Sequence, residues 1–261
     1  MKYVHRIIVL MIFGLAFNLS FAQKNIVNQW NGWYIYTGDH TITKKIGLHT
    51  EYQWIRSNII TDWQQSLPLL GLNYRTTDNT LLTLGYGYVI TYPYGKQPLN
   101  HAVGEHDIWE QFIQRQRIGR CYFNHRYRLE QRWMQNFTKT PENKYVLDNY
   151  IFRNRARYRF MVSIPLNHKE MTNNTLFLSL YDELFVNIGH NIGLNLFDQN
   201  RISATLGWQF NPDLNLQVGY MNQYIQKPNA VDMENNHTVQ LWLTYNIDFR
   251  KLFPAKIEEK Q

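Results

Sequence analysis

Residues 80–92 read Thr-Leu-Leu-Thr-Leu-Gly-Tyr-Gly-Tyr-Val-Ile-Thr-Tyr, a stretch in which large apolar residues occupy every second position. Leucine, tyrosine and isoleucine fall at the even numbers from 82 to 92, whereas threonine and glycine fill most of the odd numbers between them. Successive side chains of a strand point to opposite faces of a sheet. The alternation therefore predicts a β-strand with one apolar and one polar face.

Ten further segments show the same alternation to varying degrees. Residues 42–54, 200–211 and 237–249 show it most regularly. The other candidates are 63–75, 106–118, 120–133, 150–164, 175–188 and 213–225, with a weaker one at 29–37. Most are longer than the about 5–6 residues of strands in soluble sheets, and they reach the roughly 9–11 of a tilted membrane-crossing strand. The pattern predicts an all-β fold, a transmembrane antiparallel up-and-down β-barrel over residues 23–250.

The alternation alone does not decide which face of the strands points outward. A soluble, lipocalin-like barrel turns its apolar face inward, whereas a membrane barrel turns it toward lipid. The long strands and the tyrosines and tryptophans near the ends of the apolar faces favour the membrane barrel. So do glycines on the polar faces, which suit a crowded interior: Gly47, Gly85, Gly87, Gly207 and Gly219. We expect an apolar exterior and a polar lumen.

The connections between the candidate strands alternate in length. The long ones are 93–105, 134–149, 189–199 and 226–236, and the tighter ones between them are 75–80, 118–121, 165–174 and 211–213. Outer-membrane barrels have long outer loops and short periplasmic turns, so this rhythm fits them. An odd number of candidates cannot close an antiparallel barrel with both ends in the periplasm. We therefore expect ten strands, if 29–37 is incomplete, or twelve, if one segment contains two.

Residues 1–22 have the features of a secretory signal peptide. Lys2 and Arg6 precede an apolar run, and Ser20-Phe21-Ala22 supplies small residues where signal peptidase cleaves. The alternative is an N-terminal transmembrane anchor. Removing Lys2 and Arg6 from the 27 basic residues leaves 25 against 20 acidic ones, so the mature chain is only mildly basic. We expect the protein in the outer membrane, with residues 251–261 as a short periplasmic tail.

Six ordered pieces of the chain carry a family signal. They are His125–Trp133 (HRYRLEQRW), Arg153–Tyr158 (RNRARY), Tyr181–Phe185 (YDELF), Phe197–Arg201 (FDQNR), Leu216–Gln223 (LQVGYMNQ) and Asn236–His237 at the start of the last strand. In these pieces the chain resembles an uncharacterised family of predicted outer-membrane barrels from Bacteroidota, domain-of-unknown-function family 2490. The resemblance implies a barrel fold, and it implies neither an activity nor a catalytic residue.

Arginines recur at alternate positions on two consecutive candidate strands. If 120–133 and 150–164 pair antiparallel, at least seven arginines and one glutamate share one wall of the lumen. The predicted basic wall comprises Arg126, Arg128, Arg132, Arg153, Arg155, Arg157, Arg159 and, from a later strand, Arg201. The acidic side chains expected to pair with this wall are Glu51, Glu130 and Glu183.

Two interpretations of the basic wall remain open. Arginines spaced about 6.7 Å apart along a strand repel one another unless anions compensate. In the first interpretation, arginine–glutamate pairs and water simply fill a narrow barrel. In the second, an excess of positive charge attracts phosphate, carboxylate or another small anionic solute. Lipid A phosphates of lipopolysaccharide and an envelope protein are further candidate partners.

Enzymatic chemistry has little support in the sequence. Small outer-membrane barrels that cleave lipid use a His-x-Ser pair, and no histidine here has serine two residues on. His49 with Glu51 is the remaining pair, so an enzyme acting on lipid or lipid A is the alternative function. We expect His101, Glu105, His106 and Asp107 to be solvated residues of an outer loop, and a weak metal site is the alternative that their spacing suggests. We expect no cofactor and, given the export signal, no nucleic-acid partner.

Overall fold

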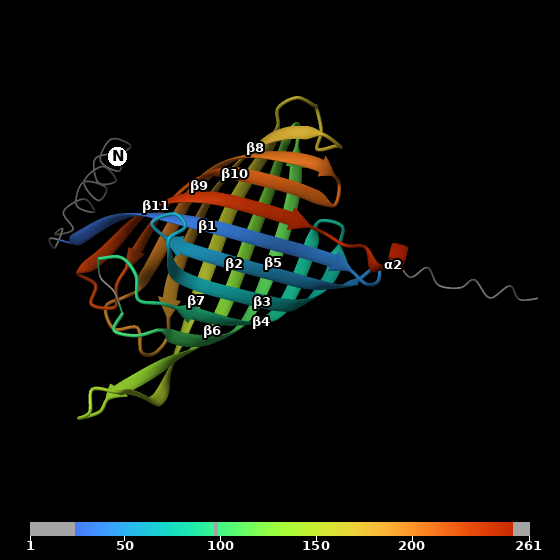
Figure 1. Cartoon of the computed structure of the whole chain (residues 1–261). Helices are drawn as coiled ribbons and strands as arrows, with labels where there is room; N and C mark the ends of the chain where they lie inside the picture. Colours follow the sequence, from blue (N-terminus) through green and yellow to red (C-terminus); the bar gives the residue numbers. More distant parts are fainter. Residues whose placement is uncertain (1–23, 97–98, 253–261) are drawn as a thin grey trace, which may run out of the picture.

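A closed sheet of eleven strands contains most of residues 24–96 and 99–252, which the computed structural model describes (Figure 1). The strands are β1 (Asn25–Thr41), β2 (Ile46–Ser57), β3 (Asp62–Thr77), β4 (Thr80–Thr91), β5 (Val103–Ile118), β6 (Cys121–Lys139), β7 (Tyr145–Pro165), β8 (Thr175–Ile188), β9 (Phe197–Asn211), β10 (Leu214–Gln226) and β11 (Asp232–Tyr245). A one-turn helix, α2 (Phe249–Leu252), follows. None of the helices in the described residues is long and apolar enough to cross a membrane. The predicted signal peptide lies outside these residues, as does all but the start of the predicted tail.

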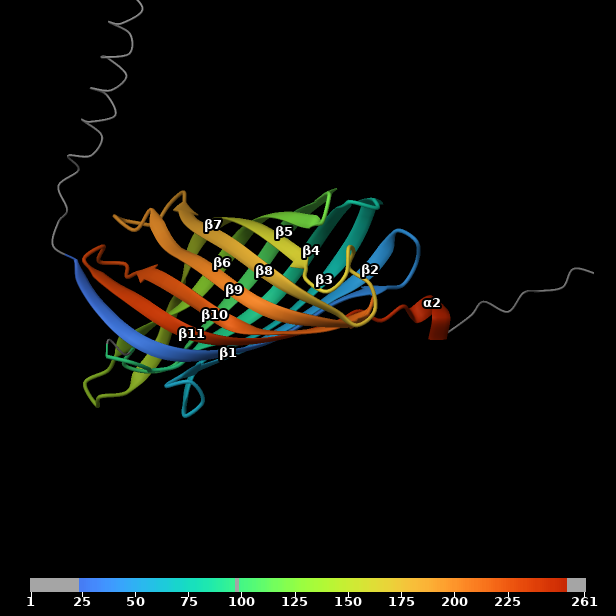
Figure 2. The same cartoon turned by 90° about the horizontal axis from the view of Figure 1, so that it is seen from above.

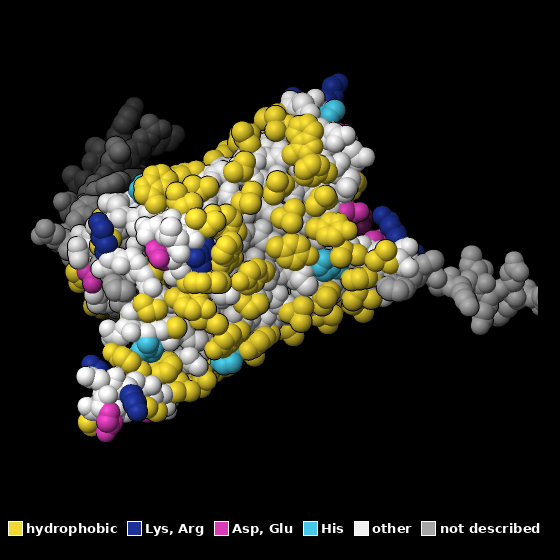
Figure 3. All heavy atoms as spheres, in the orientation of Figure 1, with side chains coloured by type: hydrophobic (Ala, Val, Ile, Leu, Met, Phe, Trp, Pro, Cys, Tyr) yellow, Lys and Arg dark blue, Asp and Glu magenta, His cyan; other side chains and the backbone are white. Residues whose placement is uncertain are grey.

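The alternation of side chains has the expected sense, with apolar groups outside. On β4, Leu82, Leu84 and Tyr86 are exposed, whereas Thr83 and Gly85 between them are buried. Hydrophobic side chains cover much of the outer wall in the view of Figure 3. Within the described residues, buried polar and charged residues outnumber buried hydrophobic ones. This arrangement is the reverse of the soluble, lipocalin-like alternative.

The barrel closes through one parallel pair of strands. All other neighbouring strands pair antiparallel, but β1 and β11 run in the same direction, with Trp30 beside His237 and Thr37 beside Thr244. Figures 1 and 2 show these first and last strands side by side. The prediction of ten or twelve strands is therefore wrong. An even number is needed only where every pair is antiparallel, and a parallel pair closes an odd number.

The first and last strands differ most from their predicted limits. β1 is a complete strand of 17 residues, not the weak segment 29–37. β11 begins at Asp232 and ends at Tyr245, so the predicted strand 237–249 is displaced. After Tyr245 the chain leaves the ladder because its amides bond elsewhere. Asn246 N–H donates to the Asp213 carbonyl, and Ile247 N–H donates to the His40 ring.

The two ends of the barrel carry different connections. One end, here the turn end, has connections 42–45, 78–79, 119–120, 166–174 and 212–213, and the chain leaves it after β11. The other, the loop end, has connections 58–61, 92–102, 140–144, 189–196 and 227–231. β6 and β7 project beyond the wall at the loop end (Figure 1). β1 starts at the loop end, so the described chain does not begin and end on one side as expected.

Two inner glycines make room for large side chains from neighbouring strands. A Cβ atom on Gly85 would lie 2.2 Å from the ring of Trp109, and one on Gly207 would lie 2.1 Å from the ring of Phe177. Trp109 and Phe177 are 0% and 3% exposed. Side chains thus fill the interior tightly, and at these two positions no residue larger than glycine fits without displacing a ring.

Candidate functional site in the barrel interior

The arginines of β6 and β7 face one another across the ladder. The two strands pair antiparallel, as the wall prediction supposed, and every second residue points inward. The inward residues that stand directly opposite are Arg126 and Arg159, Arg128 and Arg157, Glu130 and Arg155, and Arg132 and Arg153. Like charges directly opposite on a sheet are destabilising. The interior must therefore supply anionic partners from other strands.

Two buried glutamates neutralise the centre of this array. Glu130 accepts hydrogen bonds from Arg155 Nε at 2.6 Å and from Arg157 Nη1 at 2.5 Å. Glu183 of β8 accepts from Arg126 Nη2 at 2.6 Å and from Arg157 Nε and Nη2 at 3.0 and 2.7 Å. Both glutamates are 2% exposed. Arg157 therefore bridges two carboxylates at the middle of the barrel interior.

Carboxylates near the loop end pair with the next arginines outward. Arg132 makes a bidentate contact with Glu105, with both N–O distances 2.7 Å, and lies 3.9 Å from Asp107. Arg155 Nη1 donates to Asp198 at 2.9 Å. Both Arg132 and Arg155 therefore have carboxylate partners on other strands, which holds them in place.

A histidine between two carboxylates lies toward the turn end. His49 Nδ1 is 2.8 Å from Asp39 Oδ1, and its Nε2 is 3.1 Å from Glu51 Oε2. Glu51 also lies 3.6 Å from Arg128 Nη2. Because both imidazole nitrogens face carboxylates, neither is free to activate a hydroxyl. The His49–Glu51 pair that sequence reasoning considered for catalysis is thus part of an ionic network.

Arg159 differs from Arg126, Arg128 and Arg157, each of which lies within 4 Å of a carboxylate oxygen. It is 7% exposed, yet no hydrogen bond or ion pair joins it to any residue of the described ranges, and its Nε is buried without a partner. Its guanidinium lies 5.7 Å from the ring centre of Tyr181 and 5.6 Å from that of Trp242. These distances are typical of cation–π contacts, which hold the group between two rings.

A cavity of about 270 Å³ lies at this level of the interior. It takes residues from both sides of the barrel, among them Trp33 of β1, Phe177 of β8 and Trp242 of β11. Five arginines line it: Arg115, Arg126, Arg157, Arg159 and Arg201. Three carboxylates line it as well: Asp39, Glu51 and Glu183. The cavity wall therefore carries an excess of two positive charges when His49 is neutral.

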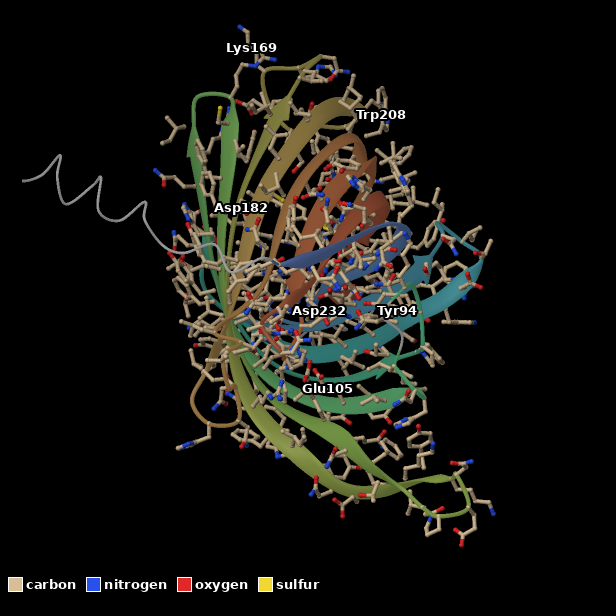
Figure 4. The ribbon with its side chains drawn as sticks, turned by 90° about the vertical axis from the view of Figure 1, so that its left-hand side faces the viewer. Tyr94, Glu105, Lys169, Asp182, Trp208 and Asp232 are labelled. Carbon is tan, nitrogen blue, oxygen red and sulfur yellow. The ribbon has the colours of Figure 1, made fainter. Side chains whose placement is uncertain are left out.

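A connection crosses part of the interior at the loop end. Tyr94, between β4 and β5, donates its hydroxyl hydrogen to Glu234 Oε2 of β11 at 2.8 Å, and Lys227 pairs with the same carboxylate. Burial, and then the nearby Glu234 carboxylate, raise the pKa of the Tyr94 hydroxyl well above its ordinary value. Figure 4 looks into this end and labels Tyr94 and Glu105 among the side chains.

Each residue of the predicted basic wall lies on a strand of the barrel. All eight arginines lie on inner positions of their strands, and the three expected glutamates contact arginines of the wall. Sequence reasoning missed four further carboxylates: Asp39, Glu105, Asp107 and Asp198. They reduce the positive excess that three glutamates alone would leave.

The expected outer-loop cluster does not form. β5 already begins at Val103, so Glu105 and Asp107 point inward from a strand toward Arg132, while His106 contacts Tyr86 from the outside. His101 packs against Phe137 instead. In the part of the chain that the structure describes, no three histidine, cysteine or acidic side chains gather as a metal ion would require.

Comparisons with known proteins identify the family of the chain. No curated protein matches it. A solved structure described as "NanC porin structure in rhombohedral crystal form" is 11% identical, with a TM-score of 0.46 over 82% of this chain and 97% of that one. The family model described as "Protein of unknown function (DUF2490)" matches residues 30–234, which is more than half of the chain. The protein therefore belongs to the DUF2490 family.

Proposed function

We propose that this protein is an outer-membrane β-barrel that forms a narrow path for small anionic solutes. Its shortest strands have 12 residues, which extend roughly 40 Å and, at a tilt of about 45°, rise about 28 Å. That rise is close to the roughly 30 Å hydrocarbon core of a bilayer. The apolar outer wall supports the same location, because exposed patches of this extent mark contact with lipid or protein.

The facing arginines of β6 and β7 carry the proposal of an anionic solute. An arginine-rich lumen wall runs along the barrel, made of Arg126 opposite Arg159, Arg128 opposite Arg157 and Arg132 opposite Arg153, with Glu130 opposite Arg155 between the last two pairs. Rings of arginine are the usual lining of pores that select anions. The low-dielectric wall of the barrel strengthens the field of these charges inside a narrow interior.

The central ion pairs set the expected conductance. Arg157 of β7 bonds to Glu130 of β6 and Glu183 of β8. Arg128 of β6 lies 3.6 Å from Glu51 of β2 on another part of the barrel, so these groups narrow the path in the middle of the interior. A solute must pass beside these groups or exchange with them. We therefore expect small current steps rather than the large ones of a wide general porin.

A planar bilayer experiment tests this function. Residues 23–261 are refolded, the folded barrel is checked by heat-modifiable migration on a gel, and the reversal potential is measured in a KCl gradient. A potential of the sign set by chloride supports the proposal. A potential set by potassium overturns it.

A second candidate function follows because arginines at the centre of the interior already have carboxylate partners. Because Arg157 already contacts two carboxylates, the arginines of the wall also fit a plugged barrel that serves a structural or partner-binding role in the envelope. This candidate predicts a folded, heat-modifiable barrel that leaves the bilayer electrically silent. A silent barrel would thus reject the path and favour this second role.

A further inference from the structure

We propose that the 270 Å³ cavity beside Arg159 is a binding site for a small organic monocarboxylate with an aromatic or apolar body. The proposal deepens the proposed function, since its role in transport rests on that function. Binding itself is an equilibrium property and is tested separately. Four observations on the cavity carry it.

The first observation is the missing partner of a buried cation. Arg159 stands directly opposite Glu183 in the β7–β8 register. That carboxylate is already bonded to Arg126 and Arg157, and no hydrogen bond joins it to Arg159. An ionised side chain that is 93% removed from solvent (7% exposed) is costly unless it is paired. A bound anion would supply the partner that the described chain does not.

The second observation is the fixed position of that cation. The rings of Tyr181 and Trp242 lie at similar distances from the Arg159 guanidinium, 5.7 and 5.6 Å from their centres. Cation–π contacts on a rigid frame leave the guanidinium pre-organised. An anion that binds there loses little free energy to ordering the site.

The third observation is the charge of the cavity as a whole. Its five arginines exceed its three carboxylates, and two of those carboxylates, Asp39 and Glu51, are both engaged by His49. The third, Glu183, is engaged by arginines. The positive charge that the three carboxylates leave uncompensated therefore lies among the arginines that line the cavity, and it favours binding of an anionic group beside them.

The fourth observation concerns the rest of the ligand. Ile35, Ile113, Met161 and Phe177 give the cavity apolar walls. The Asn124 Oδ1 atom, also at the cavity, is buried without a donor. A ligand with a carboxylate, an apolar or aromatic ring and a hydroxyl satisfies all of these groups. The volume is just below the about 300 Å³ of the smallest drug-sized pockets, so the ligand is small.

Isothermal titration of the folded barrel in detergent tests the proposal, with 4-hydroxybenzoate as the probe and the neutral 4-hydroxybenzamide as its matched control. We expect saturable binding of the acid and at least tenfold weaker binding of the amide, because the amide oxygen can accept a hydrogen bond from Arg159 but carries no negative charge to pair with it. Arg159→Gln should weaken binding of the acid by about tenfold or more. Arg117→Gln removes an exposed arginine that pairs with Glu170 at the turn end, outside both the cavity and the basic wall, and should leave binding unchanged.

The possible results separate this inference from the proposed function. Equal binding of acid and amide, no saturable binding by the wild type, or full binding by Arg159→Gln in a heat-modifiable barrel would overturn the site. Saturable binding by a barrel that is electrically silent would uphold the site and reject the path. Anion-selective current without saturable binding would uphold the path and reject the binding site.

Discussion

Arg126 of β6 and Arg159 of β7 stand directly opposite each other in an antiparallel ladder, and only one of them is bonded to a carboxylate. Arg126 donates to Glu183 at 2.6 Å, whereas Arg159 lies between two aromatic rings. Opposed like charges normally destabilise a sheet. Here Glu183, on the strand next to β7, compensates part of the repulsion, and the unpaired cation is left facing a cavity.

The buried carboxylate at the centre of the network should dominate stability. Glu183→Gln leaves Arg126 without an ionised partner and Arg157 with Glu130 alone, so we expect the free energy of unfolding to fall by about 3–5 kcal/mol. Asp182→Asn is the matched control, since Asp182 points outward on the same strand and bonds only to Asn200. Its effect should be about 0–1 kcal/mol. Urea unfolding of the refolded barrel measures the free energy of unfolding of both variants. An equal decrease in the two variants would show that Glu183 contributes no more to stability than Asp182 does.

The packing of Trp109 against glycine should be sensitive to a single methyl group. Gly85→Ala brings a Cβ atom to 2.2 Å from the indole ring, so overpacking should destabilise the barrel by about 1–3 kcal/mol. Gly87→Ala lies two residues along the same strand, and its Cβ atom would meet the Leu69 side chain at 3.2 Å and the Pro68 carbonyl oxygen at 3.5 Å. The temperature at which the gel band shifts should fall clearly for the first variant and little for the second. If Gly87→Ala lowered this temperature more than Gly85→Ala did, the indole ring of Trp109 would not lie against Gly85.

The parallel closure of the barrel predicts a specific cross-link. The hydroxyl oxygens of Thr37 and Thr244 are 3.3 Å apart across the β1–β11 pair. In a Cys121→Ser background, Thr37→Cys with Thr244→Cys should form a disulfide on mild oxidation, detected by gel shift. Thr37→Cys with Gln240→Cys is out of register by four residues, roughly 13 Å, and should not. Cross-linking of the second pair alone would indicate a different closure.

The contact at the loop end should hold the β4–β5 connection in place. Tyr94→Phe removes the hydroxyl that bonds to Glu234, so the connection should become more sensitive to added protease. The pKa of Tyr94 is raised, which means that its stabilising contribution is complete below the ordinary value of 10.0 and is lost as pH rises through the higher folded value. Protection of the wild type should therefore be constant from neutral pH to about 10. Loss of protection well below that pH would contradict this assignment.

Strand faces could be predicted from sequence because alternation is a local signal. In β4, the even positions from Leu82 to Ile90 face outward, as the pattern indicates. The inward side of Arg153, Arg155, Arg157 and Arg159 follows from the same rule. The pairing of β6 with β7 could be predicted because strands that are consecutive in the chain usually pair.

The closure and part of the charge network could not be predicted, for physical reasons. β1 places Trp33 and Ile35 on its inner face, so its alternation is weak and Asp39 was not recognised as an inner residue. At the start of β5, His106 replaces an apolar outer residue, which hides the inward positions of Glu105 and Asp107. The parallel β1–β11 pair joins segments about two hundred positions apart and has no local signal.

Opposite charge changes at one ion-paired cluster test the central claim most directly. Glu130→Gln removes a negative charge beside the path, whereas Arg155→Gln with Arg157→Gln removes two positive ones. Both break the contacts of Glu130 with these arginines, and the double variant also breaks those with Asp198 and Glu183. Reversal potentials in a KCl gradient are compared with that of the wild type, using only heat-modifiable protein. The account predicts a shift toward chloride for Glu130→Gln and toward potassium for the double variant. Shifts in the same direction, or none in either variant, would contradict it.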